Sequence, residues 1–308
     1  MVIDAHAHIF PEIRGEAAMG PIRGLGYGRI AIGGKPHQLM PPLCEETRHT
    51  PEMLLAHMDW VGVEKAVLLQ GPFYGECNAY VADAVRRFPA RLAGAAYFDP
   101  WADTQDTFIS LCNQQAFRAV KLECSEAAGL VGLHPGASLD AAEFSWLWEE
   151  LEQRALTLVL DLGAVGSASY QTNAVRLIAE DHPRLKIVIA HLAQPTSAVE
   201  SDPARWRLWE QQIDLGRLFA NVWFDMAALP TYSPREAYPY PSAGRHLKAA
   251  IDHIGPAKVL WGTDLPGLLS HATYAQLLRF AEYHLQYLSE SERRLVFGEN
   301  AASVYKFT

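Results

Sequence analysis

Eight short apolar segments recur along the 308-residue chain, and most of them are followed by a segment with helical spacing. The expected strands cover residues 1–8, 65–70, 92–98, 117–123, 156–161, 185–190, 221–226 and 258–264. Buried strands that alternate with helices predict a parallel sheet, and eight such units in a chain of this length predict a closed α/β barrel, the (β/α)₈ TIM barrel. An open doubly wound sheet would need a glycine-rich nucleotide-binding turn after the first strand, and the sequence lacks one there.

The composition favours one domain over residues 1–308 and restricts the possible partners. Apolar residues make up 49% of the chain, which is enough for a large core, and the net charge of -9 argues against nucleic acid. The sequence shows neither a signal peptide nor an apolar run long enough to span a bilayer. The four cysteines show no CxxC spacing, so we expect reduced, mostly structural thiols in a cytoplasmic protein.

Two segments are harder to interpret from sequence. Glycines and prolines break any periodicity over residues 9–50, which predicts a long loop over the active site. A lid or substrate-binding loop and a plain solvated loop are both consistent with it. The aromatic-rich interval 206–240 suggests an extra loop at the barrel rim or a contact in a homo-oligomer.

The first strand carries the clearest metal-binding pattern. If residues 1–8 form a strand, side chains alternate between its faces, so Asp4, His6 and His8 point to one side. Two imidazoles one strand step apart can bind the same divalent ion. Asp4 lies deeper on this face and is expected to support the ligands through hydrogen bonds.

Polar residues also end the later strands of the predicted barrel. They are Lys121 and Glu123 on strand four, Asp161 on strand five, His191 on strand six, Asp225 on strand seven and Asp264 on strand eight. Active sites of TIM barrels lie at the carboxyl ends of the strands, and buried charges are costly unless paired or metal-bound. The pattern therefore predicts one catalytic centre at that end of the barrel.

Taken together, these motifs resemble the amidohydrolase superfamily, in the branch called amidohydrolase-related or "amidohydrolase 2". The residues that carry the resemblance are Asp4-Ala5-His6-Ala7-His8, Val120-Lys121-Leu122, Ile189-Ala190-His191-Leu192, Asn221 to Asp225, Val259 to Pro266 and Gly298-Glu299-Asn300-Ala301. The resemblance spans the whole chain. It implies one divalent metal ion, zinc with manganese as the alternative, held by His6, His8 and Asp264.

Residues at other strand ends complete this hypothesis. Glu123 and His191 are candidates for further metal ligands, and Glu123 is equally open as a substrate contact. Lys121 and Asp161 are candidates for substrate binding, with Lys121 also open as a structural partner of a rim carboxylate and Asp161 as a ligand. Asp225 is expected to cap a neighbouring loop. The decarboxylases of the branch usually carry a histidine where this chain has Asp161, and the lactonases do not.

The predicted reaction is hydrolysis of a small lactone, ester or amide. A divalent ion lowers the pKa of water enough to supply hydroxide at neutral pH, with Asp264 as general base and the metal or His191 polarising the carbonyl. Two alternatives stay open. One is non-oxidative decarboxylation of a small aromatic carboxylate, and the other is a non-catalytic binding barrel.

Overall fold

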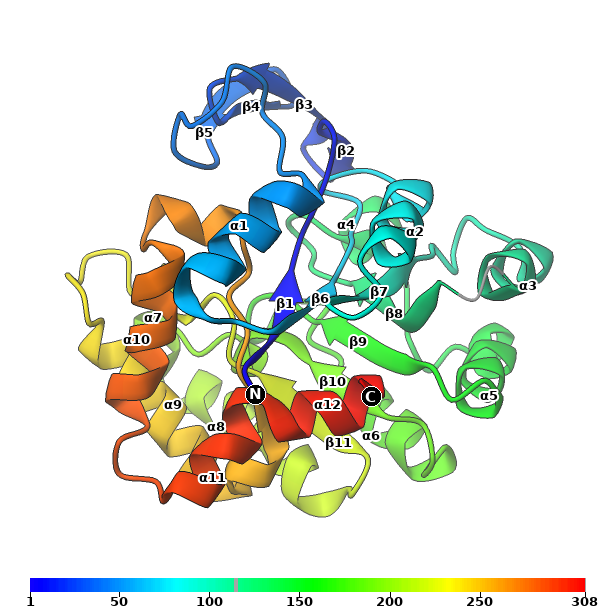
Figure 1. The fold of residues 1–308 in the computed structure, drawn as a ribbon. Coiled ribbons are helices and arrows are strands. Elements are labelled where there is room, and N and C mark those ends of the chain that lie inside the picture. Colours follow the sequence, from blue (N-terminus) through cyan, green and yellow to red (C-terminus); the bar gives the residue numbers. More distant parts are fainter. Residues whose placement is uncertain (114–115, 308) are drawn as a thin grey trace.

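A closed sheet of eight parallel strands forms the centre of the protein, whose computed structural model describes residues 1–113 and 116–307. In order around the sheet they are β1 (Ile3–Ala7), β6 (Lys65–Leu68), β7 (Leu92–Tyr97), β8 (Phe117–Glu123), β9 (Thr157–Asp161), β10 (Ile187–Ile189), β11 (Val222–Asp225) and β12 (Val259–Leu260). The chain after β12 returns to β1, where the Ala5 amide donates to the Trp261 carbonyl at 2.9 Å and Ala7 pairs with Leu265. The predicted (β/α)₈ TIM barrel is therefore confirmed (Figure 1).

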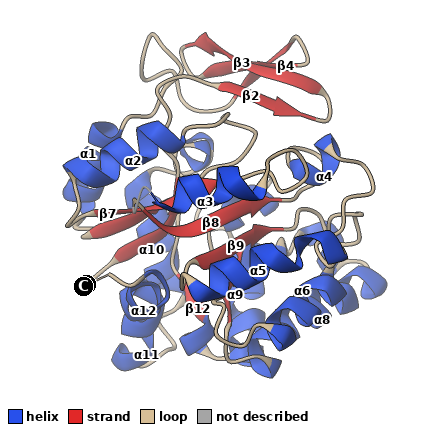
Figure 2. Cartoon of the chain, turned by 90° about the vertical axis from the view of Figure 1, so that its right-hand side faces the viewer, coloured by secondary structure: helices blue, strands red, loops and turns tan. Residues whose placement is uncertain are grey.

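Helices cover the outside of this barrel (Figure 2). The longer ones are α1 (Pro51–Val61), α2 (Asn78–Arg87), α3 (Gln105–Asn113), α5 (Ser145–Gln153), α6 (Thr172–Asp181), α8 (Pro203–Leu218), α9 (Pro241–Ile254) and α10 (Tyr274–His284). Short helices are α4 (Leu130–Leu133), α7 (Ser197–Glu200), α11 (Glu290–Arg294) and α12 (Asn300–Tyr305). Within the described ranges, no helix combines the length and the apolar character that crossing a bilayer requires.

Several helix boundaries follow from local sequence signals, and others do not. Helix α1 begins as expected, because the Thr50 side chain accepts a hydrogen bond from the Met53 amide and Pro51 occupies the first helical position. The helix expected over residues 107–115 corresponds to α3. Residues 114–115, the last two of the expected range, lie outside the described ranges. Helix α8 occupies the first part of the aromatic-rich interval, where Trp209 is buried and donates to the Leu192 carbonyl at 2.8 Å. That part of the interval is thus a packed helix and not a rim loop.

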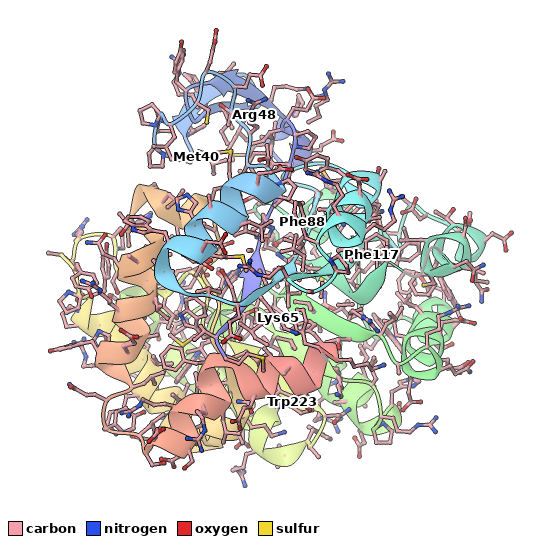
Figure 3. The ribbon with its side chains drawn as sticks, viewed as in Figure 1. Met40, Arg48, Lys65, Phe88, Phe117 and Trp223 are labelled. Atoms are coloured by element: carbon pink, nitrogen blue, oxygen red, sulfur yellow. The ribbon has the colours of Figure 1, made fainter. Side chains whose placement is uncertain are left out.

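The prediction of an irregular loop over residues 9–50 is largely wrong, because residues 14–38 form a second sheet. Its strands β2 (Arg14–Ala17), β3 (Gly20–Gly26), β4 (Arg29–Ile32) and β5 (Lys35–Gln38) run antiparallel in chain order. Several of the glycines that hid this pattern lie in its tight turns; Gly33 and Gly34, between β4 and β5, have φ angles of 54° and 81°. Ile22 and Ile30 of this sheet are buried in the same apolar cluster as the barrel. Met40, labelled in Figure 3 near this sheet, belongs to that cluster too.

A buried carboxylate fixes the start of β1 to the chain after β12. Asp4 accepts hydrogen bonds from the His6 amide, from the amide and hydroxyl of Thr263, and from the Tyr274 hydroxyl. The side chain is fully buried. Gly262 allows the close approach of the two segments, because a Cβ atom there would lie only 3.0 Å from the Cβ atom of His6. As the sequence predicted, Asp4 supports the histidines of β1 from behind.

Replacing Asp4 with alanine is expected to destabilise the protein by about 3 kcal/mol or more, because buried donors lose their acceptor. Asp4→Asn should cost less, since the amide oxygen still accepts from two amides and the hydroxyls of Thr263 and Tyr274 can turn to accept. Urea unfolding of the wild type and both variants measures the difference. Equal stability of Asp4→Ala and the wild type would contradict this role for Asp4.

Candidate active site

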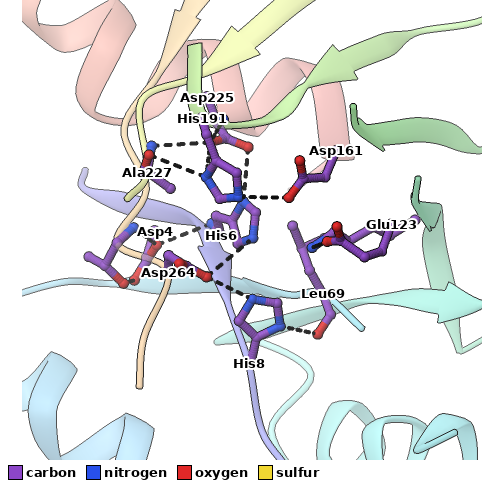
Figure 4. Close-up of polar contacts among 12 residues, drawn as sticks. Asp4, His6, His8, Leu69, Glu123, Asp161, His191, Asp225, Ala227 and Asp264 are labelled. Carbon is purple, nitrogen blue, oxygen red and sulfur yellow. Dashed lines mark hydrogen bonds and ion pairs between the residues drawn. The ribbon is translucent and has the colours of Figure 1, made fainter. Parts of the chain in front are cut away.

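The polar residues at the strand ends meet in one cavity of about 490 Å³ at the carboxyl end of the barrel. Six of the predicted site residues line it, namely His8, Lys121, Glu123, Asp161, His191 and Asp264. His6 lies behind them with a fully buried side chain, and Figure 4 shows it between Asp264 and His191. The expectation that residues from the two ends of the chain converge on one centre is therefore confirmed.

The hydrogen-bond partners of the three histidines determine which ring nitrogen carries the proton. The Nδ1 atom of His6 lies 3.0 Å from the Asp225 carboxylate, that of His8 lies 2.9 Å from the Leu69 carbonyl, and that of His191 lies 3.2 Å from the Ala227 carbonyl. These oxygens only accept hydrogen bonds, so each Nδ1 atom must donate one. In the neutral rings the Nε2 atoms therefore carry free lone pairs. Figure 4 shows those of His6 and His8 directed at Asp264 and that of His191 directed at Asp161.

These lone pairs face carboxylate oxygens, which are also acceptors. The Nε2 atom of His8 lies 3.0 Å from Oδ1 of Asp264, and the Nε2 atom of His6 lies 3.7 Å from the same oxygen. His6 Nε2 is buried and has no hydrogen-bond partner among the described residues. Burial lowers the pKa of His6 to about 4 and also lowers the pKa of His8, so both rings are neutral at pH 7. Two acceptors in contact repel each other unless a proton or a cation lies between them.

A divalent cation fits this surplus of acceptors. The Nε2 or carboxylate atoms that His6, His191 and Asp264 offer lie within 4.8 Å of one another, which is close enough to share one ion. His8 contacts the same Asp264 oxygen. Imidazole nitrogen and carboxylate oxygen are the usual ligands of catalytic zinc, and the second nitrogen of each ring is held by an acceptor, as metal-bound histidines require.

Asp225 has a larger part in this centre than the sequence indicated. One of its oxygens accepts from His6 Nδ1, and the other accepts from the amides of His191 and Ala227. It therefore does cap the neighbouring loop, as expected, and it also orients the ring of His6. Both side chains of this hydrogen-bonded pair, Asp225 and His6, are fully buried.

Glu123 is placed apart from the cluster formed by His6, His191 and Asp264. Its Oε2 atom lies 3.3 Å from Nζ of Lys121, and Asp161 is its other charged neighbour. Burial and the Asp161 charge raise the pKa of Glu123 to about 7. Glu123 therefore pairs with Lys121 and lines the cavity. Its predicted role as a metal ligand has no support, because it is not among the residues whose ligand atoms lie within 4.8 Å of one another.

Asp161 contacts His191 through Oδ2, which lies 3.1 Å from the Nε2 atom of that ring. Its other oxygen accepts from the Gly163 amide and from the side chain of Gln194, both at 3.0 Å. Burial opposes protonation of His191, but the Asp161 carboxylate outweighs it and raises the pKa of His191 to about 10. In the absence of a metal, Asp161 and His191 thus form an ion pair.

Unusual backbone conformations hold His191 and Asp264 in place. Residues 191–194 all have positive φ angles between 47° and 60°, and Asp264 has a φ angle of 61°. Such angles are uncommon for residues other than glycine and concentrate at functional sites. The turn after β10 directs His191 into the cavity and brings Gln194 back to Asp161.

Sequence reasoning missed several residues of the cavity wall. Gln194 follows His191 by three positions, and no signal in the sequence indicates the left-handed turn that brings it there. Gln38 and Leu39, at the end of the second sheet, also line the cavity. Tyr74 and Tyr232 line it as well, and no motif in the sequence singles them out.

The fold and the site define a TIM-barrel protein with an imidazole and carboxylate centre suited to a divalent metal. The chain belongs to the amidohydrolase family, whose model, described as "Amidohydrolase", matches residues 3–307. This agrees with the resemblance stated from the motifs.

Known proteins are similar to it over most of their length. An L-fucono-1,5-lactonase from Burkholderia ambifaria is 26% identical over 262 residues, which is 80% of this chain and 81% of that protein. An amidohydrolase from Burkholderia multivorans shares the fold in crystal structures with bound HEPES and with bound zinc, at TM-scores of 0.75 and 0.72, 18% identity and full coverage of both chains. A probable 2-pyrone-4,6-dicarboxylic acid hydrolase from Acinetobacter baumannii, with citric acid bound, has a TM-score of 0.71 at 18% identity over 99% of each chain.

The ion pair of His191 and Asp161 leads to a prediction for the metal-free protein. The pKa of His191 in the folded protein, about 10, lies above its ordinary value of 6.5. The ion pair therefore contributes its full stabilisation below pH 6.5, and this stabilisation is lost as the pH rises through 10. In chelator-treated protein, the His191 ring should titrate near pH 10 by NMR, and Asp161→Asn should move its pKa downward. His191→Gln identifies the resonance. A wild-type titration near pH 6.5 would contradict the pairing.

Proposed function

We propose that this protein hydrolyses a small lactone, with a divalent metal, most simply zinc, held by His6, His191 and Asp264 beside His8. The observation that carries the proposal is the position of Asp264. Its carboxylate lies within the group of possible metal ligands and also lines the cavity where a substrate would bind. The family match and the lactonase relative support a hydrolase of small lactones.

The proposed metal supplies Lewis acidity, which polarises a carbonyl group and lowers the pKa of water. The chain itself supplies the proton acceptor. Burial opposes ionisation of Asp264, but the adjacent His8 ring and the charge of His191 lower its pKa to about 2, so the carboxylate is ionised at neutral pH. It can accept a proton from the attacking water and later deliver it to the ring oxygen that leaves as the lactone opens.

Other residues position this acceptor and the substrate. Asp225 and the Ala227 carbonyl fix the rings of His6 and His191, so the Nε2 atom of His6 stays directed at Asp264 and that of His191 at Asp161. Asp161 accepts from Gln194 and faces the cavity, where it can bind a substrate hydroxyl. Water attack on the carbonyl carbon and cleavage of its bond to the ring oxygen yield a hydroxy acid.

Decarboxylation is the less favoured reaction for this site. The branch members that decarboxylate usually carry a histidine at the end of strand five, where this chain has Asp161. Here that carboxylate is already engaged with His191 and Gln194. A carboxylate at this place adds negative charge where a decarboxylase must hold an anionic substrate.

Asp264→Asn should lower kcat/KM for lactones by about 10²- to 10⁴-fold, because the amide cannot accept the water proton. A lactone panel followed with a pH indicator measures turnover, and thermal unfolding checks the fold. Asp252→Asn, on the exposed face of α9, serves as the matched control. Retained activity of Asp264→Asn would remove this residue from the mechanism.

The same assays separate the alternatives. Release of CO₂ from aromatic carboxylates without lactone turnover would overturn the proposal in favour of a decarboxylase. Inactivity in both assays, with the purified protein folded and supplied with zinc, would favour a binding barrel.

A further inference from the structure

The cavity is poor in cationic side chains that could bind an anionic substrate. Among the residues that line it, lysine occurs once, as Lys121, and arginine does not occur. Three carboxylates line the same cavity, those of Glu123, Asp161 and Asp264. His191, the other lining residue that can carry positive charge, is paired with Asp161 or bound to the proposed metal, so Lys121 is the one lining cation left for a substrate anion.

Lys121 already forms an ion pair with Glu123. Its side chain is 3% exposed, and its Nζ atom lies 3.3 Å from Oε2 of Glu123. Burial opposes the charged form of Lys121, but Glu123, Asp161 and Asp264 outweigh it and raise its pKa, so the ammonium group stays charged among carboxylates. A substrate carboxylate approaching Lys121 would meet Glu123 first, because Glu123 is the more exposed partner at 12%.

Two tyrosines provide neutral hydrogen-bond donors to the same space. The ring of Tyr74 lies 4.8 Å from the ring of His8, and the ring of Tyr232 lies 6.4 Å from that of His191. Both side chains line the cavity, and neither hydroxyl has a hydrogen-bond partner among residues 1–113 and 116–307. Burial raises the pKa of both phenols well above 10, so each remains protonated and can donate.

We propose that the pair of Lys121 and Glu123 is a specificity element that excludes lactones bearing a carboxylate, and that the hydroxyls of Tyr74 and Tyr232 bind an uncharged, hydroxylated lactone. Glu123 and Asp161 then accept hydrogen bonds from substrate hydroxyls, and the tyrosines donate to substrate oxygens. The inference rests on the proposed lactonase activity. It specifies in addition that the substrate is uncharged and which residues select it.

Matched substrates test the charge selection. Aldonolactones and aldarolactones of the same stereochemistry differ by one terminal carboxylate in place of a hydroxymethyl group. The wild type should prefer the uncharged member by about 100-fold in kcat/KM, since like charges in contact are strongly disfavoured. Above pH 7, where Glu123 is ionised, Glu123→Gln removes its negative charge and frees Lys121, so it should shift this ratio at least about tenfold toward the aldarolactone.

Tyrosine variants test the donors. Tyr74→Phe and Tyr232→Phe should each lower kcat/KM for the aldonolactone about tenfold more than for γ-butyrolactone, which lacks hydroxyls. Tyr97→Phe, in a half-buried tyrosine of β7 that does not line the cavity, is the control and should leave this ratio at the wild-type value. A merely structural effect would lower both activities together.

The outcomes distinguish this inference from the proposed function. Equal turnover of charged and uncharged lactones, or an unchanged ratio in Glu123→Gln, would overturn the role of the Lys121 and Glu123 pair while leaving the lactonase standing. Equal losses on both substrates in the tyrosine variants would overturn their role as donors. Failure to hydrolyse any lactone would overturn the proposed function and this inference with it.

Discussion

The closure of the barrel is the constraint on which the site depends. His6 and Asp264 are separated by most of the chain, and they meet only because the segment after β12 hydrogen-bonds to β1. Asp4 holds this junction with four hydrogen bonds from both segments and from α10. The same contacts that complete the fold therefore place a carboxylate against two imidazoles.

The site that results has more acceptors than donors at its centre. Three rings donate through Nδ1 to oxygens behind them and present Nε2 lone pairs to one another and to carboxylates. Such an arrangement is unfavourable in a buried space unless a positive charge occupies it. Protonation of His191 relieves part of the surplus, while His6 and His8 stay neutral, so a divalent ion is the natural complement of this centre.

Much of this could be predicted from the sequence, because strand ends are visible as polar residues that close apolar runs. His6, His8, His191 and Asp264 were found in this way, and their meeting point followed from the barrel. The ring tautomers could not be predicted, since they depend on carbonyls and carboxylates of other strands. The left-handed turn over residues 191–194 contains no glycine, so nothing in the sequence indicates that Gln194 reaches Asp161.

The second sheet was missed for a different reason. Its strands are short, three of the four carry glycine or proline, and few of their side chains are buried, so their alternation is weak. Yet the chain just after it contributes Leu39 to the cavity wall. The shape of the cavity thus depends partly on a segment whose structure the local pattern conceals.

The most direct test of this account is anomalous diffraction from crystals grown with zinc or cobalt. The account predicts one strong peak in contact with the Nε2 atoms of His6 and His191 and with Asp264, and the loss of this peak in His6→Ala. A cavity without a peak at saturating metal, or a peak bound by Glu123 away from His6, would contradict it.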